Sequence, residues 1–296
     1  MMRYGKAFCP GHVTGFFEIC DSDSDPSRRG SRGAGFSAEL GAVSHAMVEP
    51  RDHRKITVVV HGLDDYVGGD VSIRAIKHLI GERKLKVEVE TDLQLPLSQG
   101  FGMSGAGALS ATLAVVAAVG DEYGLTREDA IKAAHLAEVE SNTGLGDVAG
   151  QSVGGFERRL EPGLPPDGKI ASAKMDTEVV LCVLGGALET KSVLGDAEQR
   201  QRIIEAGRKA MGDFGQSENL KRFCEVSWSF ARDARLATRE IERAVADASP
   251  HGCASMSMLG RSVFAFGHAD ELEKVLQKHG KMFRCRIASE GAKVVE

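Results

Sequence analysis

The stretch Pro96–Gly107 (PLSQGFGMSGAG) constrains this chain more than any other segment. It places four glycines (Gly100, Gly102, Gly105, Gly107) around Ser104, directly before the apolar run Ala108–Val119. Glycines allow a backbone to curl so that several N–H groups point at one anion. The apolar run predicts a buried helix, whose N-terminus adds about half a positive charge at the same place. The stretch therefore predicts a loop that binds a polyphosphate.

Other interpretations of this loop remain open. A P-loop is excluded because no lysine follows the glycines. Gly100–Gly105 does match GxGxxG, the fingerprint of dinucleotide binding, which also needs an acidic residue about 20 positions later at the end of a second strand. The acids at that distance, Asp121 and Glu122, follow a predicted helix instead. An NAD-dependent oxidoreductase therefore stays an alternative, as does a glycine turn that only caps a core helix.

Composition and charge describe a soluble globular protein. The chain of 296 residues is 42% hydrophobic and 27% charged, with a net charge of −5 that gives no nucleic-acid footprint. The longest apolar stretch, Leu109–Val119, is shorter than the ~20 residues of a bilayer span, and no signal-peptide core is present at the N-terminus. The six scattered cysteines without a CxxC pair predict reduced thiols. We expect a cytoplasmic protein that binds neither nucleic acid nor membrane.

Apolar periodicity and turn residues predict an α/β (α+β) protein with two lobes. Glu161–Lys169 (EPGLPPDGK) is the segment richest in turn residues, so we place the lobe boundary between residues 165 and 166. Residues 1–165 form the nucleotide-binding lobe and residues 166–296 the C-terminal lobe. The expected strands are Phe36–Val48, Ile56–Val60, Leu85–Glu90, Gly155–Leu160, Val179–Leu184, Cys253–Met258, Ser262–Phe266 and Met282–Ile287. The expected helices include Asp70–Ile80, Ala108–Val119, a helix capped by Thr126 that ends near Glu140, Val148–Val153, segments within 198–247, and Ala269–Lys278.

The polar segment Asp21–Arg32 (DSDSDPSRRGSR) has two interpretations. Its composition is typical of a solvated surface turn. Its three arginines, Arg28, Arg29 and Arg32, lie beside glycines and could equally form a clamp for a carboxylate or a phosphate.

Three motifs in order indicate a family. Pro10-Gly11 lies near the N-terminus, the glycine loop follows, and Thr143–Gly155 (TGLGDVAGQSVGG) comes last. This order resembles the GHMP kinase superfamily over residues 6–160. Within the superfamily, PGHVTGFFEI (Pro10–Ile19), GSRGAGF (Gly30–Phe36) and AHLAEVESNTGLGDVAGQ (Ala134–Gln151) are most similar to the archaeal pantoate kinase family.

The resemblance implies an enzyme that uses ATP and Mg²⁺ to phosphorylate the primary hydroxyl of pantoate. The product would be 4-phosphopantoate, on a route to coenzyme A. The implied GHMP kinase fold has a ribosomal S5 domain 2-like N-terminal lobe and a ferredoxin-like C-terminal lobe, with the active site between them. A homodimer is compatible with the sequence.

The resemblance also implies roles for single residues. Ser104 matches the loop serine that reaches Mg²⁺ and the phosphates, and Asp147 matches an aspartate that acts as base or orients the acceptor hydroxyl. Glu138 is the expected second Mg²⁺ ligand, with Glu140 as its rival. The other expected nucleotide-binding residues are Pro96, Gly100, Gly102, Met103, Gly105 and Ala106, and the expected substrate-binding residues are Arg28, Arg32, Thr143 and Gln151.

Three positions depart from the family pattern. Met103 replaces one serine of the usual pair, and His12, which we expect to be catalytic, stands where many relatives have a permanent cation. Cys253–Arg261 (CASMSMLGR) occupies the place of a third, glycine-rich motif but holds one internal glycine and favours a plain core strand. Alternatives are therefore a homoserine- or mevalonate-type kinase, or a non-catalytic binding protein with the same fold.

Overall fold

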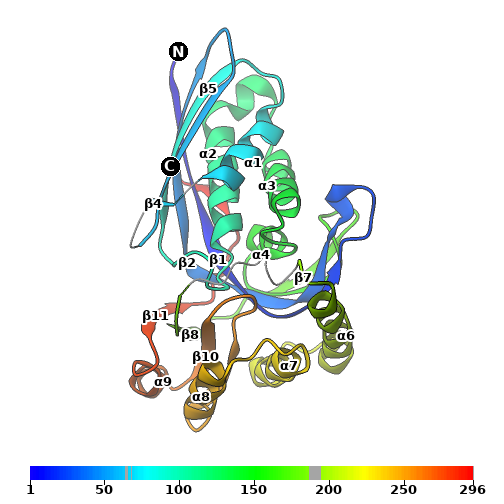
Figure 1. Ribbon diagram of the computed structural model, residues 1–296. Helices are drawn as coiled ribbons and strands as arrows, with labels where there is room; N and C mark the ends of the chain where they lie inside the picture. The colour runs from blue at the N-terminus through cyan, green and yellow to red at the C-terminus, as the bar shows by residue number, and fades with distance from the viewer. Residues whose placement is uncertain (64–65, 68, 187–194, 296) are drawn as a thin grey trace.

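The computed structural model describes residues 1–63, 66–67, 69–186 and 195–295. Two sheets are stacked one above the other, and each carries its own helices (Figure 1). The upper sheet has eight strands with α1–α3 on one face, and the lower sheet has four strands with α8 and α9 beside them. The expectation of a two-lobe α/β protein is confirmed.

The upper sheet is ordered β12-β1-β2-β5-β3-β4, and β6 joins β2 and β7 at its lower end. All neighbours are antiparallel except β3 and β5. The strands are β1 (Arg3–Cys20), β2 (Gly30–Pro50), β3 (Lys55–His61), β4 (Tyr66–Val67), β5 (Leu85–Leu93), β6 (Phe156–Glu161), β7 (Lys169–Ala173) and β12 (Lys293–Val295).

Helix α2 (Met103–Tyr123) is the centre of the upper core. It packs between the sheet and the helices α1 (Asp70–Ile80) and α3 (Arg127–Ser141), and the short α4 (Asp147–Val153) lies near its first turn. Among the described residues, α2 alone is long and apolar enough to cross a membrane, but 83% of its apolar window is buried inside the protein. We therefore assign it as a core helix. The capping box predicted at the start of α3 is present, since Thr126 and Asp129 bond reciprocally.

The lower sheet has the order β11-β8-β10-β9, entirely antiparallel. Its strands are β8 (Glu178–Val183), β9 (Gly252–Met256), β10 (Ser262–Gly267) and β11 (Lys281–Arg286). Numbered within this lobe the order is 4-1-3-2, which is the ferredoxin-like order implied by the resemblance. The helices are α6 (Ala197–Phe214), α7 (Leu220–Asp233), α8 (Arg239–Ala248) and α9 (Ala269–Leu276).

The β1–β2 pair runs through both halves of the molecule. The strands have 18 and 21 residues, well beyond the mode of about 5–6. Their register shifts between Pro10 and Gly11 and again between Thr14 and Phe16. Bulges bend a strand and re-aim its side chains, so the segment between these two shifts turns from the upper sheet toward the helices below. The polar segment Asp21–Arg32 contains the turn between the strands, with a short 3₁₀ helix at Pro26–Arg28.

The division between the lobes comes later in the chain than residue 165. Glu161–Lys169 is the turn of the β6–β7 hairpin, and both of its strands belong to the upper sheet. The lower sheet begins with β8, and β12 returns to the upper sheet to pair with β1. Proline and glycine mark a hairpin turn as readily as a linker, which is why composition alone placed the boundary too early.

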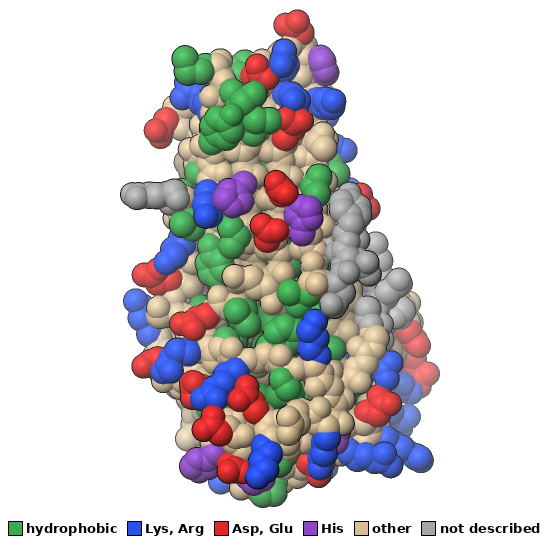
Figure 2. Space-filling view, turned by 90° about the vertical axis from the view of Figure 1, so that its left-hand side faces the viewer, with side chains coloured by type: hydrophobic (Ala, Val, Ile, Leu, Met, Phe, Trp, Pro, Cys, Tyr) green, Lys and Arg blue, Asp and Glu red, His purple; other side chains and the backbone are tan. Residues whose placement is uncertain are grey.

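The face of the upper sheet that no helix covers is solvated. Figure 2 shows basic and acidic side chains interspersed with small hydrophobic areas on this face. In β5 buried and more exposed residues alternate, and in β1 the side chain of Tyr4 is 71% exposed. In the part of the sheet formed by β5 and the start of β1, the core therefore lies on the helix side.

An aromatic cluster joins the lower half of the β1–β2 pair to the C-terminal lobe. Phe223 of α7 is fully buried, stacks on Phe264 of β10 at 5.4 Å and meets Phe156 of β6 edge-on at 5.0 Å. Phe16 of β1 and Phe36 of β2 also contact it. One side chain thus packs against strands of both sheets.

We expect Phe223→Ala to reduce the free energy of unfolding by about 3–5 kcal/mol, because it leaves a cavity where both lobes meet. Urea denaturation followed by far-ultraviolet circular dichroism measures this loss. Phe283→Ala, at a partly buried position of β11, is the matched control and should cost clearly less. Equal losses for the two variants would contradict the role assigned to the cluster.

Candidate active site

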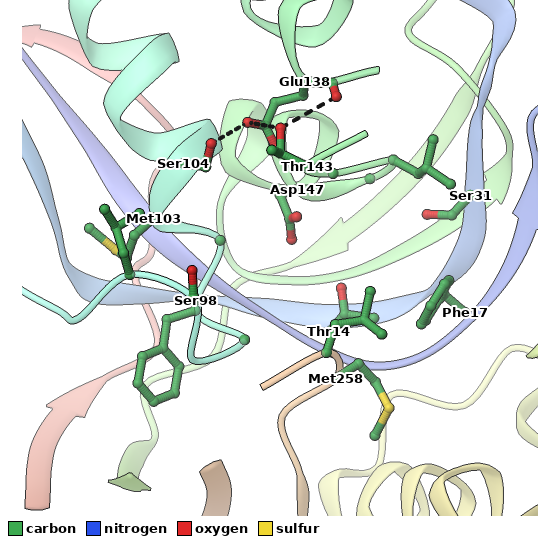
Figure 3. Close-up of a pocket in the computed structure, with 18 residues that line it drawn as sticks. Thr14, Phe17, Ser31, Ser98, Met103, Ser104, Glu138, Thr143, Asp147 and Met258 are labelled. Carbon is green, nitrogen blue, oxygen red and sulfur yellow. Dashed lines mark hydrogen bonds between the residues drawn. The ribbon is translucent and has the colours of Figure 1, made fainter. Parts of the chain in front are cut away.

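A cavity of about 340 Å³ opens between the two lobes. Its walls come from the N-terminus of α2, the segment 143–147 before and at the start of α4, the lower part of β1, and the turn between β9 and β10. In Figure 3 the carboxylate of Asp147 points into the middle of the cavity, with Ser104 on one side and Thr14 and Phe17 on the other. Elements far apart in the sequence therefore converge on one small space.

The glycine loop forms the wall at the N-terminus of α2. Gly102 is the N-cap residue with φ of 60°, and Gly100 has φ of 77°, a region that favours glycine. Gln151 of α4 donates from Nε2 to the carbonyl of Gly102 at 2.8 Å, and the amide of His12 donates to the carbonyl of Phe101 at 2.9 Å. The first turn of a helix leaves amides without an intrahelical acceptor, and Met103 and Ser104 of this turn line the cavity, so the loop stays a candidate anion site.

Glu138 lies at the floor of the cavity with two hydroxyl donors. Ser104 donates to its Oε1 at 2.6 Å and Thr143 donates to the same atom at 2.9 Å. Full burial and the nearby charge of Asp147 raise the pKa of Glu138 to about 7, although the two hydroxyls act in the opposite direction. Because a Cβ on Gly144 would meet oxygens of both Glu138 and Asp147, the two carboxylates converge over this glycine.

The rival of Glu138 lies elsewhere. Glu140 contacts His78 at 3.0 Å and Arg74 at 3.5 Å, both on α1. Residues two positions apart on a helix face different directions, so only one of the two acids can reach the cavity.

The oxygen donors at this place fit a divalent cation of the Mg²⁺ type. Ser104 and Glu138 offer a hydroxyl and a carboxylate beside the amides that would hold phosphates. Mg²⁺ is commonly held by one or two protein oxygens together with phosphate oxygens. No lysine, arginine or histidine lines the described part of the cavity, so the convergent acids have no side-chain cation directly between them.

Asp147 is connected to a buried chain of charged groups behind the cavity. Its Oδ1 lies 2.8 Å from Nδ1 of His12, whose Nε2 lies 2.8 Å from Oε1 of Glu157. Arg159 donates to the same oxygen of Glu157 and, at 3.3 Å, to the hydroxyl of Thr14. His12 and Glu157 are fully buried and Arg159 is 2% exposed, whereas Asp147 reaches the cavity.

The structure brings some of the expected site residues to the cavity wall and leaves others outside it. Gly100, Gly102, Met103, Ser104, Glu138, Thr143 and Asp147 line the cavity. Pro96, Gly105, Ala106, Gln151 and His12 are not part of the lining; Gln151 and His12 lie directly behind it.

The arginines of the polar segment do not reach the cavity. Arg28 contacts Asp167 at 3.4 Å, and Arg32 in β2 contacts Glu18 at 3.2 Å. Neither lines the site, so the expected clamp is not assembled in this structure. The extended strand β2 begins at Gly30, earlier than expected, and it directs Arg32 toward its cross-strand partner.

The segment expected to be the third motif is both a core strand and part of the cavity wall. Cys253–Met256 lie in β9, whereas Met258 and Leu259 line the cavity. The amide of Met258 donates to the carbonyl of Thr14 at 3.0 Å, and Gly260 approaches the glycine loop so closely that a Cβ would meet the amide of Gly100. This turn therefore connects the C-terminal lobe to β1 and to the glycine loop.

Sequence reasoning missed Thr14, Phe17 and Ser31 on the wall and Glu157 and Arg159 behind it. The one sequence feature that could have pointed to Glu157 and Arg159 is their spacing of two residues inside a predicted strand. Residues i and i+2 of a strand share one face, so an acid and a base at this spacing form a pair on either the solvated or the buried face. Periodicity alone does not decide which.

Comparisons with known proteins agree with this geometry. The family described as "GHMP kinases N terminal domain" matches residues 69–155. The pantoate kinase of Methanospirillum hungatei is 30% identical over 298 residues, covering 98% of this chain and 96% of its own length. The pantoate kinase of Methanocaldococcus jannaschii is 31% identical, covering 95% and 99%.

Solved structures support the same family. A structure described as a phosphotransferase related to the CoA biosynthesis pathway superposes with a TM-score of 0.84 at 28% identity, covering 100% of this chain and 99% of its own. A homoserine kinase from Cytophaga hutchinsonii gives a TM-score of 0.70 at 14% identity, which is a likeness of fold.

We expect Glu138→Gln to stabilise the metal-free protein at pH 8. In the unfolded chain this carboxyl ionises near its ordinary pKa, whereas in the folded protein it ionises near 7. Above pH 7 its charge therefore destabilises the fold by up to about 3 kcal/mol, and this cost vanishes as the pH falls toward the unfolded value.

Urea denaturation with a chelator present, at pH 8 and pH 5, measures this effect. The gain should be large at pH 8 and small at pH 5. Glu140→Gln, on the exposed side of the same helix, is the control and should give no gain. A gain for Glu138→Gln that is equal at both pH values would contradict the electrostatic cause.

Proposed function

This chain belongs to the GHMP kinase family, and we propose that it transfers the γ-phosphoryl group of ATP to the primary hydroxyl of pantoate. The product is 4-phosphopantoate, an intermediate of coenzyme A biosynthesis. The observation that carries the proposal is the position of the Asp147 carboxylate in the cavity, beside the Ser104–Glu138 pair and the N-terminus of α2. The nearly full-length similarity to pantoate kinases supports this acceptor.

The nucleotide side of the proposed reaction uses the backbone. Free amides at the start of α2 and the positive end of its dipole neutralise phosphate charge, and phosphoryl transfer depends mostly on such positioning and neutralisation. In this proposal Ser104 and Glu138 would hold Mg²⁺, which when bound would supply positive charge to offset the negative charge of the phosphates. The raised pKa of Glu138 expresses the cost of its charge before a cation arrives.

The acceptor side lies between Asp147 and the lower part of β1. Asp147 orients the hydroxyl and accepts its proton late in the transfer. Phe17 and Met258 offer an apolar surface for the branched carbon of pantoate, and Thr14 and Ser31 offer hydroxyls. Arg159, which donates to Thr14 from behind the wall, supplies positive potential on the side where the substrate carboxylate would lie.

Localisation and assembly remain predictions. The six cysteines are free thiols in the structure, in keeping with a reducing cytoplasm. Sedimentation equilibrium of the purified protein would measure whether it forms the expected homodimer.

The test of the function is ADP release by the purified protein with ATP and Mg²⁺, against pantoate, homoserine, mevalonate and no acceptor. We expect release that pantoate alone stimulates, with a phosphorylated product detected by mass spectrometry. Release stimulated by homoserine or mevalonate instead would replace the acceptor but keep the kinase. ATP binding without release for any acceptor would favour a binding protein, and NADH binding without ATP binding would favour the oxidoreductase.

Asp147→Asn should lower kcat by about 10²–10⁴-fold, because an amide does not accept the hydroxyl proton. Its circular dichroism spectrum and melting temperature should stay close to those of the wild type, because Asp147 lies partly in the open cavity. Asp121→Asn, which removes the same charge at an exposed position near the end of α2, is the control. A folded Asp147→Asn protein with wild-type kcat would contradict the role of Asp147 as the group that accepts the hydroxyl proton.

A further inference from the structure

The two ring nitrogens of His12 each face a carboxylate. Nδ1 lies 2.8 Å from Asp147 and Nε2 lies 2.8 Å from Glu157. An ionised carboxylate accepts hydrogen bonds and donates none, and a neutral imidazole carries a proton on only one of its nitrogens. Both short contacts are therefore satisfied together only by the imidazolium form.

Arg159 is paired with Glu157 in this buried position. It donates to the oxygen of Glu157 that His12 also contacts. A buried charge is costly unless it has a partner of opposite sign, and the guanidinium of Arg159 supplies that partner to the carboxylate of Glu157. The four groups, two acids and two bases, form a chain without net charge when His12 is protonated.

Glycines hold this chain in place. A Cβ on Gly150 would lie 2.5 Å from Nε2 of His12, and a Cβ on Gly35 would lie 2.9 Å from the same atom. A Cβ on Gly146 would lie 2.6 Å from Nε of Arg159. The backbone of α4 and β2 therefore packs directly against the charged side chains, and the ring of His12 has a single place to lie.

We propose that Glu157 is a positioning residue that, backed by Arg159, fixes His12 as a permanent imidazolium whose Nδ1–H orients Asp147 toward the acceptor hydroxyl. This inference rests on the proposed function of Asp147. Glu157 touches neither the cavity nor any reacting atom, and it acts only through His12. The sequence has His12 where many relatives of the family have a permanent cation. In this proposal a buried glutamate keeps that histidine protonated, so that it takes the place of the cation.

The charges around His12 favour the proposed imidazolium form. Burial opposes the charge on His12, but the hydrogen bonds to Asp147 and Glu157 outweigh it, and the pKa of His12 is raised above its usual value. The charged groups that face the ring are Asp147 of α4 and Glu157 and Arg159 of β6. Since the folded pKa is raised, the imidazolium persists to a higher pH than that of a free histidine and is lost as the pH rises through the raised value.

The first test is the dependence of kcat on pH for Glu157→Gln. Without the second carboxylate, His12 should titrate nearer its ordinary value of about 6.5, so its protonated fraction at pH 8.5 falls to about 1%. We expect kcat near wild type at pH 6 and a loss of about 10–100-fold at pH 8.5, with the KM for ATP little changed. Glu161→Gln, at the exposed end of the same strand, should keep the wild-type profile.

Two outcomes of this test would overturn the proposal. One is an unchanged kcat at every pH. The other is an equal loss at every pH, which indicates a purely structural role for Glu157.

A second variant keeps all the charges but disturbs the packing around the ring of His12. Gly150→Ala introduces a methyl group toward His12, and it should reproduce the alkaline loss of Glu157→Gln. Gly212→Ala, on α6, adds the same group in open space and is the control. If Glu157→Gln fails to fold, this pair still decides the proposal, and a wild-type profile for Gly150→Ala would contradict it.

A third measurement does not depend on the reaction. Nuclear magnetic resonance of ring-¹⁵N-labelled histidine, with His12 assigned by its loss in His12→Asn, reports the protonation of both nitrogens. We expect an imidazolium in the wild type at pH 8 and a neutral ring in Glu157→Gln. A neutral ring in the wild type would overturn the proposal. Failure of the proposed function would appear separately, as ADP release that no acceptor stimulates.

Discussion

The arrangement of this site depends on one buried chain of charges, Asp147–His12–Glu157–Arg159. Burying charged groups is costly unless each is paired, and here every member has a partner of opposite sign. The chain joins α4, β1 and β6, and the glycines of α4 and β2 let the backbone approach it. A Cβ at Gly35, Gly146 or Gly150 would enter the space that these side chains occupy.

Backbone groups line one half of the cavity, and side chains line the other half. The N-terminus of α2 offers amides and a dipole, which suit any polyphosphate. The lower part of β1 and the turn between β9 and β10 offer specific side chains, which distinguish acceptors. Glu138 lines the cavity at an energetic cost, since burial disfavours its charge and raises its pKa to about 7. This is the usual exchange of stability for function at a reactive centre.

Features set by residues close together in the sequence could be predicted, whereas features set by contacts between distant residues could not. The glycine turn, the buried helix α2 and the cap at Thr126 are local patterns, and the sequence was sufficient to predict them. The sequence also singled out Ser104, Glu138 and Asp147, which line the cavity. Glu157 and Arg159 were missed because their burial results from pairing with β2 and from contact with His12, 145 positions away from Glu157. The lobe boundary was placed too early because a hairpin turn and a linker share the same residues. The choice between Glu138 and Glu140 required knowing which face of α3 meets the cavity.

One further consequence comes from the pairing of β12 with β1. Lys293–Val295 lie beside Lys6–Phe8, and the amide of Ala292 donates to the carbonyl of Gln151 in α4. The sheet that carries His12 is therefore completed by residues that leave the ribosome almost 290 positions later. During synthesis the first strand waits with an unpaired edge while the whole C-terminal lobe is made. The edge of β1 that β12 covers can therefore be paired only after Lys293–Val295 have been made, so this part of the sheet is completed late in synthesis.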